Sequence, residues 1–180
     1  MPKSSVSHRP RSPEYALLGF LYLQPNHGYE LHRLLIAELG ETWHVSQSQT
    51  YAILKRLETQ GYITSTTVEQ EKLPAIQNLT ISRTGRQRFE AWLETPSGSS
   101  VRAIRLEFIT RLYFAQKLAP ERILPMLEAQ ITEMQNSLAR LEASLAILSD
   151  DRKFNRLSLQ LRIQQLKSIL DWLVECRKVF

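Results

Sequence analysis

Cysteine and long apolar runs are nearly absent from this chain of 180 residues. Cys176 is the only cysteine, which excludes an internal disulfide and fits a reducing, cytoplasmic compartment. A redox switch at Cys176 is the less favoured alternative to a small apolar filler. No apolar run approaches the roughly 18 residues needed to cross a bilayer. We therefore expect a cytoplasmic protein without a membrane partner.

Aspartate is also scarce, and the first one is Asp150. The sequence contains no Gly-rich phosphate loop, no Gly-x-Ser-x-Gly elbow and no His-Glu-x-x-His helix. Its four histidines lack metal-ligand spacing, since His27 and His32 are five residues apart. We expect no enzyme activity, no metal and no cofactor, and interpret His27 as a residue at a helix start.

The positive charge of the chain does not by itself locate a binding site. The net charge is +5, which suits a nucleic-acid partner. However, residues 1–94 contain 10 Lys and Arg against 9 Asp and Glu, and residues 95–180 contain 13 against 9. Any positively charged binding surface must therefore come from local clusters of Lys and Arg.

The N-terminal half has the element order of a winged helix-turn-helix. After a flexible basic tail over residues 1–12, helices are predicted from about Pro13, from about Gly28, and from Ser46 or Ser48 up to Gly61. Residues 63–69 and 76–81 predict a two-stranded wing, and Ser82 is a candidate N-cap for a further helix. Residues 13–95 form the expected domain, and residues 95–100 are the expected boundary.

The third of these helices has two contrasting faces. Ile53, Leu54 and Leu57 fall within one sector and must face the core. The opposite sector is small, polar and basic, with Arg56 at its edge. It consists of Ser48, Tyr51, Ala52, Lys55 and Thr59.

The C-terminal half, residues 101–180, is predicted to be wholly helical. Its apolar residues repeat at intervals of three and four, which is a heptad pattern and usually implies a partner helix. We interpret this seam, with an apolar surplus on the last helix, as a homodimer interface. Its members are Leu124, Leu127, Ile131, Met134, Leu138, Leu141, Leu145, Leu148, Leu166, Leu170 and Leu173.

Several short segments, in this order and spacing, resemble the PadR family of transcriptional regulators. They are Ala16-Leu17-Leu18-Gly19, His27-Gly28-Tyr29-Glu30-Leu31, the residues Ser46, Tyr51, Leu54, Leu57, Glu58, Gly61, Tyr62 and Ile63, and Ser82-Arg83-Thr84-Gly85-Arg86. The helical half, including residues 108–114, resembles the dimerisation region of the same family. The expected fold is therefore mostly α, a winged helix followed by a helical dimerisation domain.

The resemblance implies a dimeric regulator, usually a repressor, that leaves double-stranded DNA when a small-molecule effector or another signal acts on it. It implies that Ser48, Tyr51 and Lys55 face the major groove. Side-chain chemistry adds Gln47 and Gln49 as adenine contacts, and Lys55 and Arg56 as phosphate or guanine contacts.

The wing departs from the family pattern, because its tip contains Glu69 and Glu71, and its only basic residue, Lys72, is the candidate DNA contact of the wing. Carboxylates are repelled by phosphate. Arg9 and Arg11 of the tail are an alternative DNA contact, and a solvated tail without a role is about equally compatible with the sequence.

Two further alternatives stay open. Trp43 and Trp92 are more often core fillers, but a flat aromatic effector stacking on them is a second hypothesis. The rival to the regulator is a non-catalytic protein-interaction adaptor built from the same winged helix and coiled-coil-like helices. Steep salt dependence of binding would distinguish DNA from a protein partner.

Overall fold

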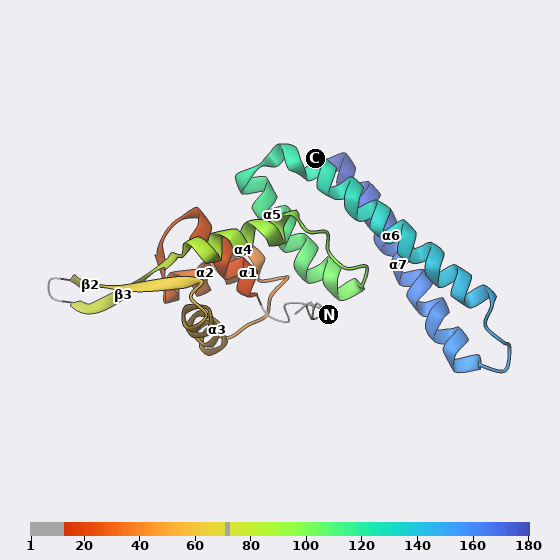
Figure 1. Ribbon diagram of the computed structural model, residues 1–180, viewed down its shortest axis with the longest axis horizontal. Coiled ribbons are helices and arrows are strands. Elements are labelled where there is room, and N and C mark those ends of the chain that lie inside the picture. The colour runs from red at the N-terminus through yellow and green to blue at the C-terminus, as the bar shows by residue number, and fades with distance from the viewer. Residues whose placement is uncertain (1–12, 71–72) are drawn as a thin grey trace, which may run out of the picture. The chain divides into compact units, whose positions relative to one another are not determined.

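The computed structural model describes residues 13–70 and 73–180, and the chain divides into two compact units between Trp92 and Leu93 (Figure 1). The division precedes residues 95–100, where the sequence suggested a boundary. Those residues belong to the second unit. Each unit has its own core.

The N-terminal unit is a winged helix, as the sequence predicted. Its helices are α1 (Glu14–Leu23), α2 (Gly28–Leu39), α3 (Gln47–Thr59) and α4 (Arg83–Glu94). The strands are β1 (Asn26–His27), β2 (Ile63–Gln70) and β3 (Leu73–Ile81). Helix α1 has little polar surface and is buried over most of its length, including Leu17 and Leu18.

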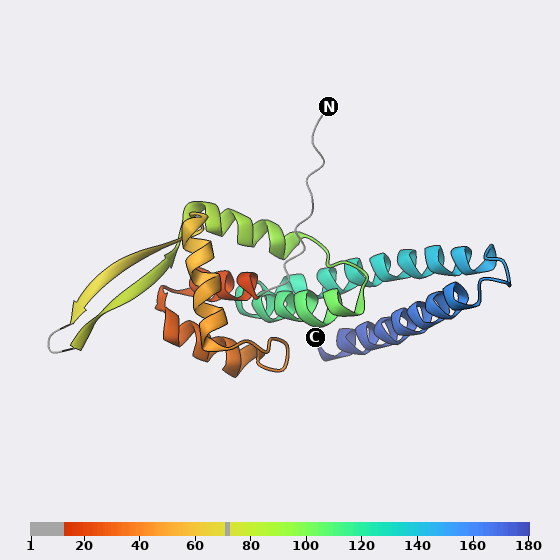
Figure 2. The ribbon, with the colours of Figure 1, turned by 90° about the horizontal axis from the view of Figure 1, so that it is seen from below.

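The wing is part of a three-stranded sheet and not an isolated hairpin. Strands β2 and β3 pair antiparallel from Ile63↔Ile81 outwards, and Figure 2 shows them projecting as a ribbon. Strand β1 adds two residues on the other side of β3, giving the order β1-β3-β2. Prediction of a two-stranded wing was incomplete, because a two-residue strand after Pro25 has no periodicity to detect.

The turn between α3 and β2 fixes where the wing begins. Gly61 has a φ of +73°, a conformation that favours glycine. The Ser82 hydroxyl donates to the Gly61 carbonyl at 2.6 Å and accepts the Gly85 N–H at 3.0 Å. Ser82 is therefore the N-terminal cap of α4, as predicted, and it also ties α4 to the end of α3.

The C-terminal unit is helical, as predicted. It contains the π-helical η1 (Ala103–Phe108), α5 (Ile109–Leu118), the short η2 (Pro120–Arg122), α6 (Ile123–Ala146) and α7 (Lys153–Val179). Helices α6 and α7 lie side by side in both views (Figures 1 and 2). Ion pairs join them at Lys167–Glu142 (2.9 Å) and Arg177–Glu128 (2.8 Å). Among the described residues, no helix is both long and apolar enough to cross a membrane.

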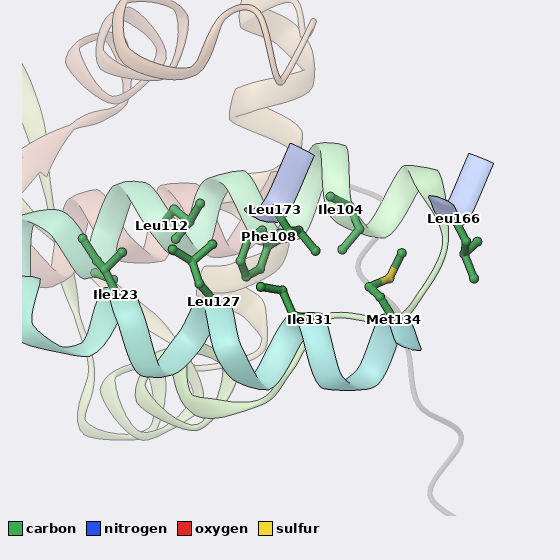
Figure 3. Packing of buried hydrophobic residues seen from close by; sticks show 10 residues of the cluster. Ile104, Phe108, Leu112, Ile123, Leu127, Ile131, Met134, Leu166 and Leu173 are labelled. Carbon is green, nitrogen blue, oxygen red and sulfur yellow. The ribbon is translucent and has the colours of Figure 1, made fainter. Parts of the chain in front are cut away.

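Much of the heptad seam closes within the chain, and its assignment to an interface between chains stays a prediction for the members that remain exposed. Figure 3 shows seam residues meeting Ile104, Phe108 and Leu112 in one apolar cluster. Buried in the cluster are Leu127, Ile131, Met134, Leu166 and Leu173, with Leu138, Leu141 and Leu170 partly buried against it. The side chains buried here are covered by their own chain and present no surface to a second copy.

The ends of the seam differ from the prediction. Ile123 is buried and takes the core position, whereas Leu124 is 44% exposed. Leu145 is half-buried near the end of α6, and Leu148 lies beyond the last residue of that helix. The heptad pattern did not foresee η1 and α5 as packing partners, because their apolar residues follow no heptad.

Candidate nucleic-acid interface

Helix α3 begins with a reciprocal cap. The Ser46 hydroxyl accepts the Gln49 N–H at 3.3 Å, and the Gln49 side-chain oxygen accepts the Ser46 N–H at 2.8 Å. This capping box fixes the first residue of the helix. The sequence placed Gln49 on an adenine edge, but its carboxamide oxygen is engaged in the cap.

A buried hydroxyl sets α3 against α2. Thr50 is fully buried, and its hydroxyl lies 3.0 Å from His32 Nδ1 and 3.3 Å from the Ser46 carbonyl. A buried polar group is costly unless it is bonded. The Thr50–His32 contact therefore favours one arrangement of the two helices.

The polar sector of α3 faces solvent, as its spacing predicted. Ile53, Leu54 and Leu57 are buried on the inner side. Ser48, Tyr51 and Lys55 lie on the outer side, and Tyr51 is 45% exposed. Gln47 is also exposed at the helix start. A helix that presents its first turns in this way has the geometry of a recognition helix.

A surface hollow of about 700 Å³ lies beside this face, between α3, the start of α2 and β3. Its lining includes Tyr51, Lys55, Tyr29 and Gln77. Tyr29 is 57% exposed and Gln77 is exposed. Sequence reasoning missed both. The His27-Gly28-Tyr29 motif could have indicated Tyr29. Gln77 is placed beside the hollow only by the β2–β3 register, which the sequence does not give.

The start of α2 is shaped around Tyr51. His27 Nδ1 accepts the Glu30 N–H at 3.2 Å and caps the helix, as predicted from its position. A Cβ at Gly28 would lie 2.7 Å from a ring carbon of Tyr51. Glycine therefore lets the tyrosine ring lie directly against the α2 backbone.

Arg56 is paired with another side chain of the protein, although its own side chain is 46% exposed. Its guanidinium pairs with the Glu14 carboxylate at 3.0 Å, and Arg88 pairs with the same carboxylate. Arg88 lies over the Tyr62 ring at 4.3 Å. Burial lowers the pKa of Arg88, but its bond to Tyr15 and nearby charges raise it overall. Arg56 thus anchors α3 to α1, and its contact with DNA stays a prediction.

Both candidate effector tryptophans are core residues of the N-terminal unit, each 7% exposed. The Trp92 indole stacks on Tyr15 with ring centroids 4.6 Å apart and planes 6° from parallel. The backbone N–H of Trp43 donates to the Leu39 carbonyl at 2.8 Å. Tyr15 already covers one face of Trp92, so a stacked effector would need the other face.

Three of the predicted DNA contacts, Arg9, Arg11 and Lys72, lie outside the described residues. Within the described ranges, no group of three His, Cys, Asp or Glu residues could hold a metal ion.

The three-stranded winged helix and its exposed third helix define a DNA-binding regulator of the winged-helix class. Residues 17–91 match the Transcriptional regulator PadR-like family, and residues 104–180 match the family Virulence activator alpha C-term. The chain belongs to the PadR-like family of transcriptional regulators.

The chain is similar to several individual proteins. The chain is 31% identical over 134 residues to the negative transcriptional regulator PadR of Bacillus subtilis, covering 73% of this chain and 71% of that one. It is 32% identical over 82 residues to a probable transcriptional regulator of Mycobacterium tuberculosis, covering 46% and 43%. The crystal structure of Bacillus subtilis PadR in complex with operator DNA aligns with 25% identity over 93% of this chain and 97% of that one, with a TM-score of 0.45.

Proposed function

We propose that this protein is a dimeric repressor that binds operator DNA through α3 and leaves it when an effector binds. It acts in the cytoplasm and performs no catalytic step. The observation that carries the proposal is the solvent-facing polar sector of α3, held in place by the capping box and by Thr50. Its curated relative is described as a negative transcriptional regulator, which supports repression.

Base and phosphate contacts are divided along the exposed face. Ser48 and Tyr51 read base edges, and Gln47 assists at the helix start, where such helices approach the groove. Lys55 contacts phosphate. Tyr29 and Gln77 extend this surface along the hollow. Arg56, already paired with Glu14, serves mainly to hold α3.

Two copies are needed because one recognition helix covers only a few base pairs. The exposed side of α7 offers an interface, with Phe154 86%, Leu157 60% and Leu161 56% exposed. These residues are three and four apart, so they form one apolar stripe. The dimer would place two α3 helices on half-sites of a pseudo-palindrome.

Bacillus subtilis PadR has been crystallised in complex with p-coumaric acid. For this chain, a small organic effector would act by binding one dimer geometry better than another. Stacking of an effector on Trp43 and Trp92 is the second hypothesis beside their role as core residues, tested by tryptophan fluorescence during titration and by the loss of that response in Trp92→Ala.

A gel-shift on the DNA upstream of its own gene tests the proposal, with Lys55→Ala compared to Lys153→Ala. Both lysines are exposed, but Lys153 starts α7 in the other unit. We expect Lys55→Ala to weaken binding about tenfold and to lower the salt slope by about 1. Lys153→Ala should bind normally. Absence of wild-type binding at low salt would refute the DNA-binding function.

A further inference from the structure

The segment that follows α4 is bonded to α6 at two points. The Ser97 N–H donates to the Gln130 side-chain oxygen at 3.0 Å, and the Gln130 side-chain amide donates to the Ser97 carbonyl at 3.1 Å. Two residues further on, the Ser99 hydroxyl accepts the Ser137 hydroxyl at 2.8 Å. The path of this segment is therefore set by side chains of the C-terminal unit.

The bonds to Ser97 form a buried group, which we call the Ser97 clamp and which consists of Ser97, Arg111 and Gln130. These residues are 2%, 3% and 1% exposed. Arg111 of α5 donates to the Ser97 hydroxyl, while one carboxamide, that of Gln130, pairs with both peptide groups of Ser97. Turning the backbone at Ser97 would break both pairings and leave buried polar groups without partners, which is costly. The clamp therefore favours a single orientation of residue 97.

The connection between the Ser97 clamp and α4 is short and stiff. Helix α4 ends at Glu94, so only Thr95 and Pro96 lie between the helix and Ser97. The proline ring fixes its own φ, and the residue before a proline is restricted to extended conformations. At its other end α4 is tied to the end of α3 through Ser82. The clamp thus limits the directions in which α4 can leave the C-terminal unit.

We propose that the Ser97 clamp selects the spacing between the two half-sites of the operator. By limiting how α4 leaves the C-terminal unit, it limits the distance and angle between the two α3 helices of a dimer. Gln130 is the central positioning residue and acts on DNA only through Ser97. This inference rests on the proposed function. It assigns specificity for spacing to the C-terminal unit, whereas specificity for bases belongs to α3.

Gel-shifts of the full-length protein on two operators test this role. The first is the operator mapped by footprinting in the DNA upstream of its own gene. The second has one base pair inserted at the centre, which moves a half-site by about 3.4 Å and turns it by about 35°. Simultaneous binding of two half-sites strengthens binding by roughly 10²–10⁴-fold and is lost where the geometry forbids it. We expect the wild type to bind the lengthened operator at least about tenfold more weakly.

Two glutamines of α6 give a matched pair of variants. Gln130→Leu removes both bonds to the Ser97 backbone, whereas Gln135→Leu makes the same change at an exposed position. We expect Gln130→Leu to bind the two operators about equally and to bind an isolated half-site as well as the wild type does, because α3 is unchanged. Gln135→Leu should keep the wild-type preference for the shorter operator. A loss of stability alone would not remove a preference between two spacings.

Insertion of Gly-Gly between Thr95 and Pro96 tests the same role without altering the core, and it decides if Gln130→Leu does not fold. Both flanking residues are exposed, so the insertion leaves the clamp bonds in place while freeing α4 from them. We expect it to remove the spacing preference as Gln130→Leu does. Hydrogen exchange of the Ser97 amide, resolved by fragmentation mass spectrometry, should be slow in the wild type and in the insertion variant, and fast in Gln130→Leu.

Three results would overturn the proposal: equal binding of both operators by the wild type, a spacing preference that persists in either folded variant, or fast exchange of the Ser97 amide in the wild type. If the wild type binds no DNA at low salt, the proposed function fails and the spacing role fails with it. Hydrogen exchange would still show whether the clamp holds Ser97. Normal DNA binding without a spacing preference would refute the spacing role alone.

Discussion

At the scale of single residues, Gly28 and Tyr51 act as a pair. A Cβ at Gly28 would lie 2.7 Å from one ring carbon of Tyr51 and 3.1 Å from another. We expect Gly28→Ala to displace the ring and weaken DNA binding with little change in the melting temperature, because the new Cβ meets a side chain that is 45% exposed and can move. Gel-shift and thermal melting measure the two effects.

The double variant Gly28→Ala/Tyr51→Ala shows whether the glycine acts through the tyrosine. If it does, adding Gly28→Ala to Tyr51→Ala costs no further DNA affinity, since the displaced ring is already gone. Additive losses would mean that Gly28 contributes to binding by itself, for example through close approach of its backbone to DNA.

Cys176 is predicted to be an inert thiol. It is half-buried beside the α6–α7 cluster, and burial raises the pKa of its thiol. Since only the thiolate is nucleophilic, a raised pKa lowers the reactive fraction at neutral pH. We expect iodoacetamide to label the native protein at pH 7.5 much more slowly than the guanidinium-unfolded protein, by mass spectrometry. Equal rates would instead favour a redox role.

At the scale of elements, one residue at the start of α3 stabilises the helix and another faces the expected DNA surface. Ser46 caps the helix, whereas Ser48 is exposed on the outer sector. We expect Ser46→Ala to lower the free energy of unfolding by about 1 kcal/mol. Ser48→Ala should leave stability within about 0.5 kcal/mol and weaken DNA binding. Urea unfolding and gel-shift on both variants measure this, and the reverse pattern would contradict the assignment.

Gln49 tests the same distinction between a capping residue and a DNA-contacting residue. The sequence predicted that Gln49 contacts DNA, whereas in the structure its side chain caps α3. If its side chain acts only through the Ser46 N–H, Gln49→Ala destabilises the protein and leaves operator specificity unchanged. Altered specificity among mutated operators, measured by competition gel-shift, would return Gln49 to the DNA-contacting set.

Local signals explain which elements could be predicted. The two faces of α3, its capping serine and the Gly61 turn follow from residue types at short spacing, so they were visible in the sequence. Strand β1 is too short to show periodicity. The Gln49 side chain can either cap the start of α3 or contact a base edge, and its residue type does not distinguish the two. Arg56 at the edge of its helix finds Glu14 on α1, 42 residues away, a partner that helical spacing cannot reveal.

At the scale of the whole molecule, the heptad seam shows the limit of periodicity. The repeat correctly indicated that α6 and α7 pack on other helices, but it does not distinguish a partner in the same chain from one in a second copy. Here η1 and α5 complete the cluster within the chain. The proposed dimer would therefore use residues outside this buried cluster, and the apolar stripe of Phe154, Leu157 and Leu161 is an exposed part of α7 that suits it.

Charge inserted into that stripe should separate the copies. In Leu157→Lys/Leu161→Lys, two like charges per chain would be buried at a two-fold interface without partners, which is strongly unfavourable. Light scattering after gel filtration should give a dimer for the wild type and a monomer for the variant. Asn155→Lys is the control, because it adds a charge to an exposed position of α7 that is not three or four residues from any member of the stripe.

Loss of the dimer should also weaken operator binding. A dimer binds its second half-site at a high effective concentration, which strengthens binding by roughly 10²–10⁴-fold over one site. The Leu157→Lys/Leu161→Lys variant should lose affinity on that scale for a full operator but not for an isolated half-site, because α3 is unchanged. A dimer that persists in the double variant would place the interface elsewhere, whereas a monomer with full operator affinity would show that one copy suffices.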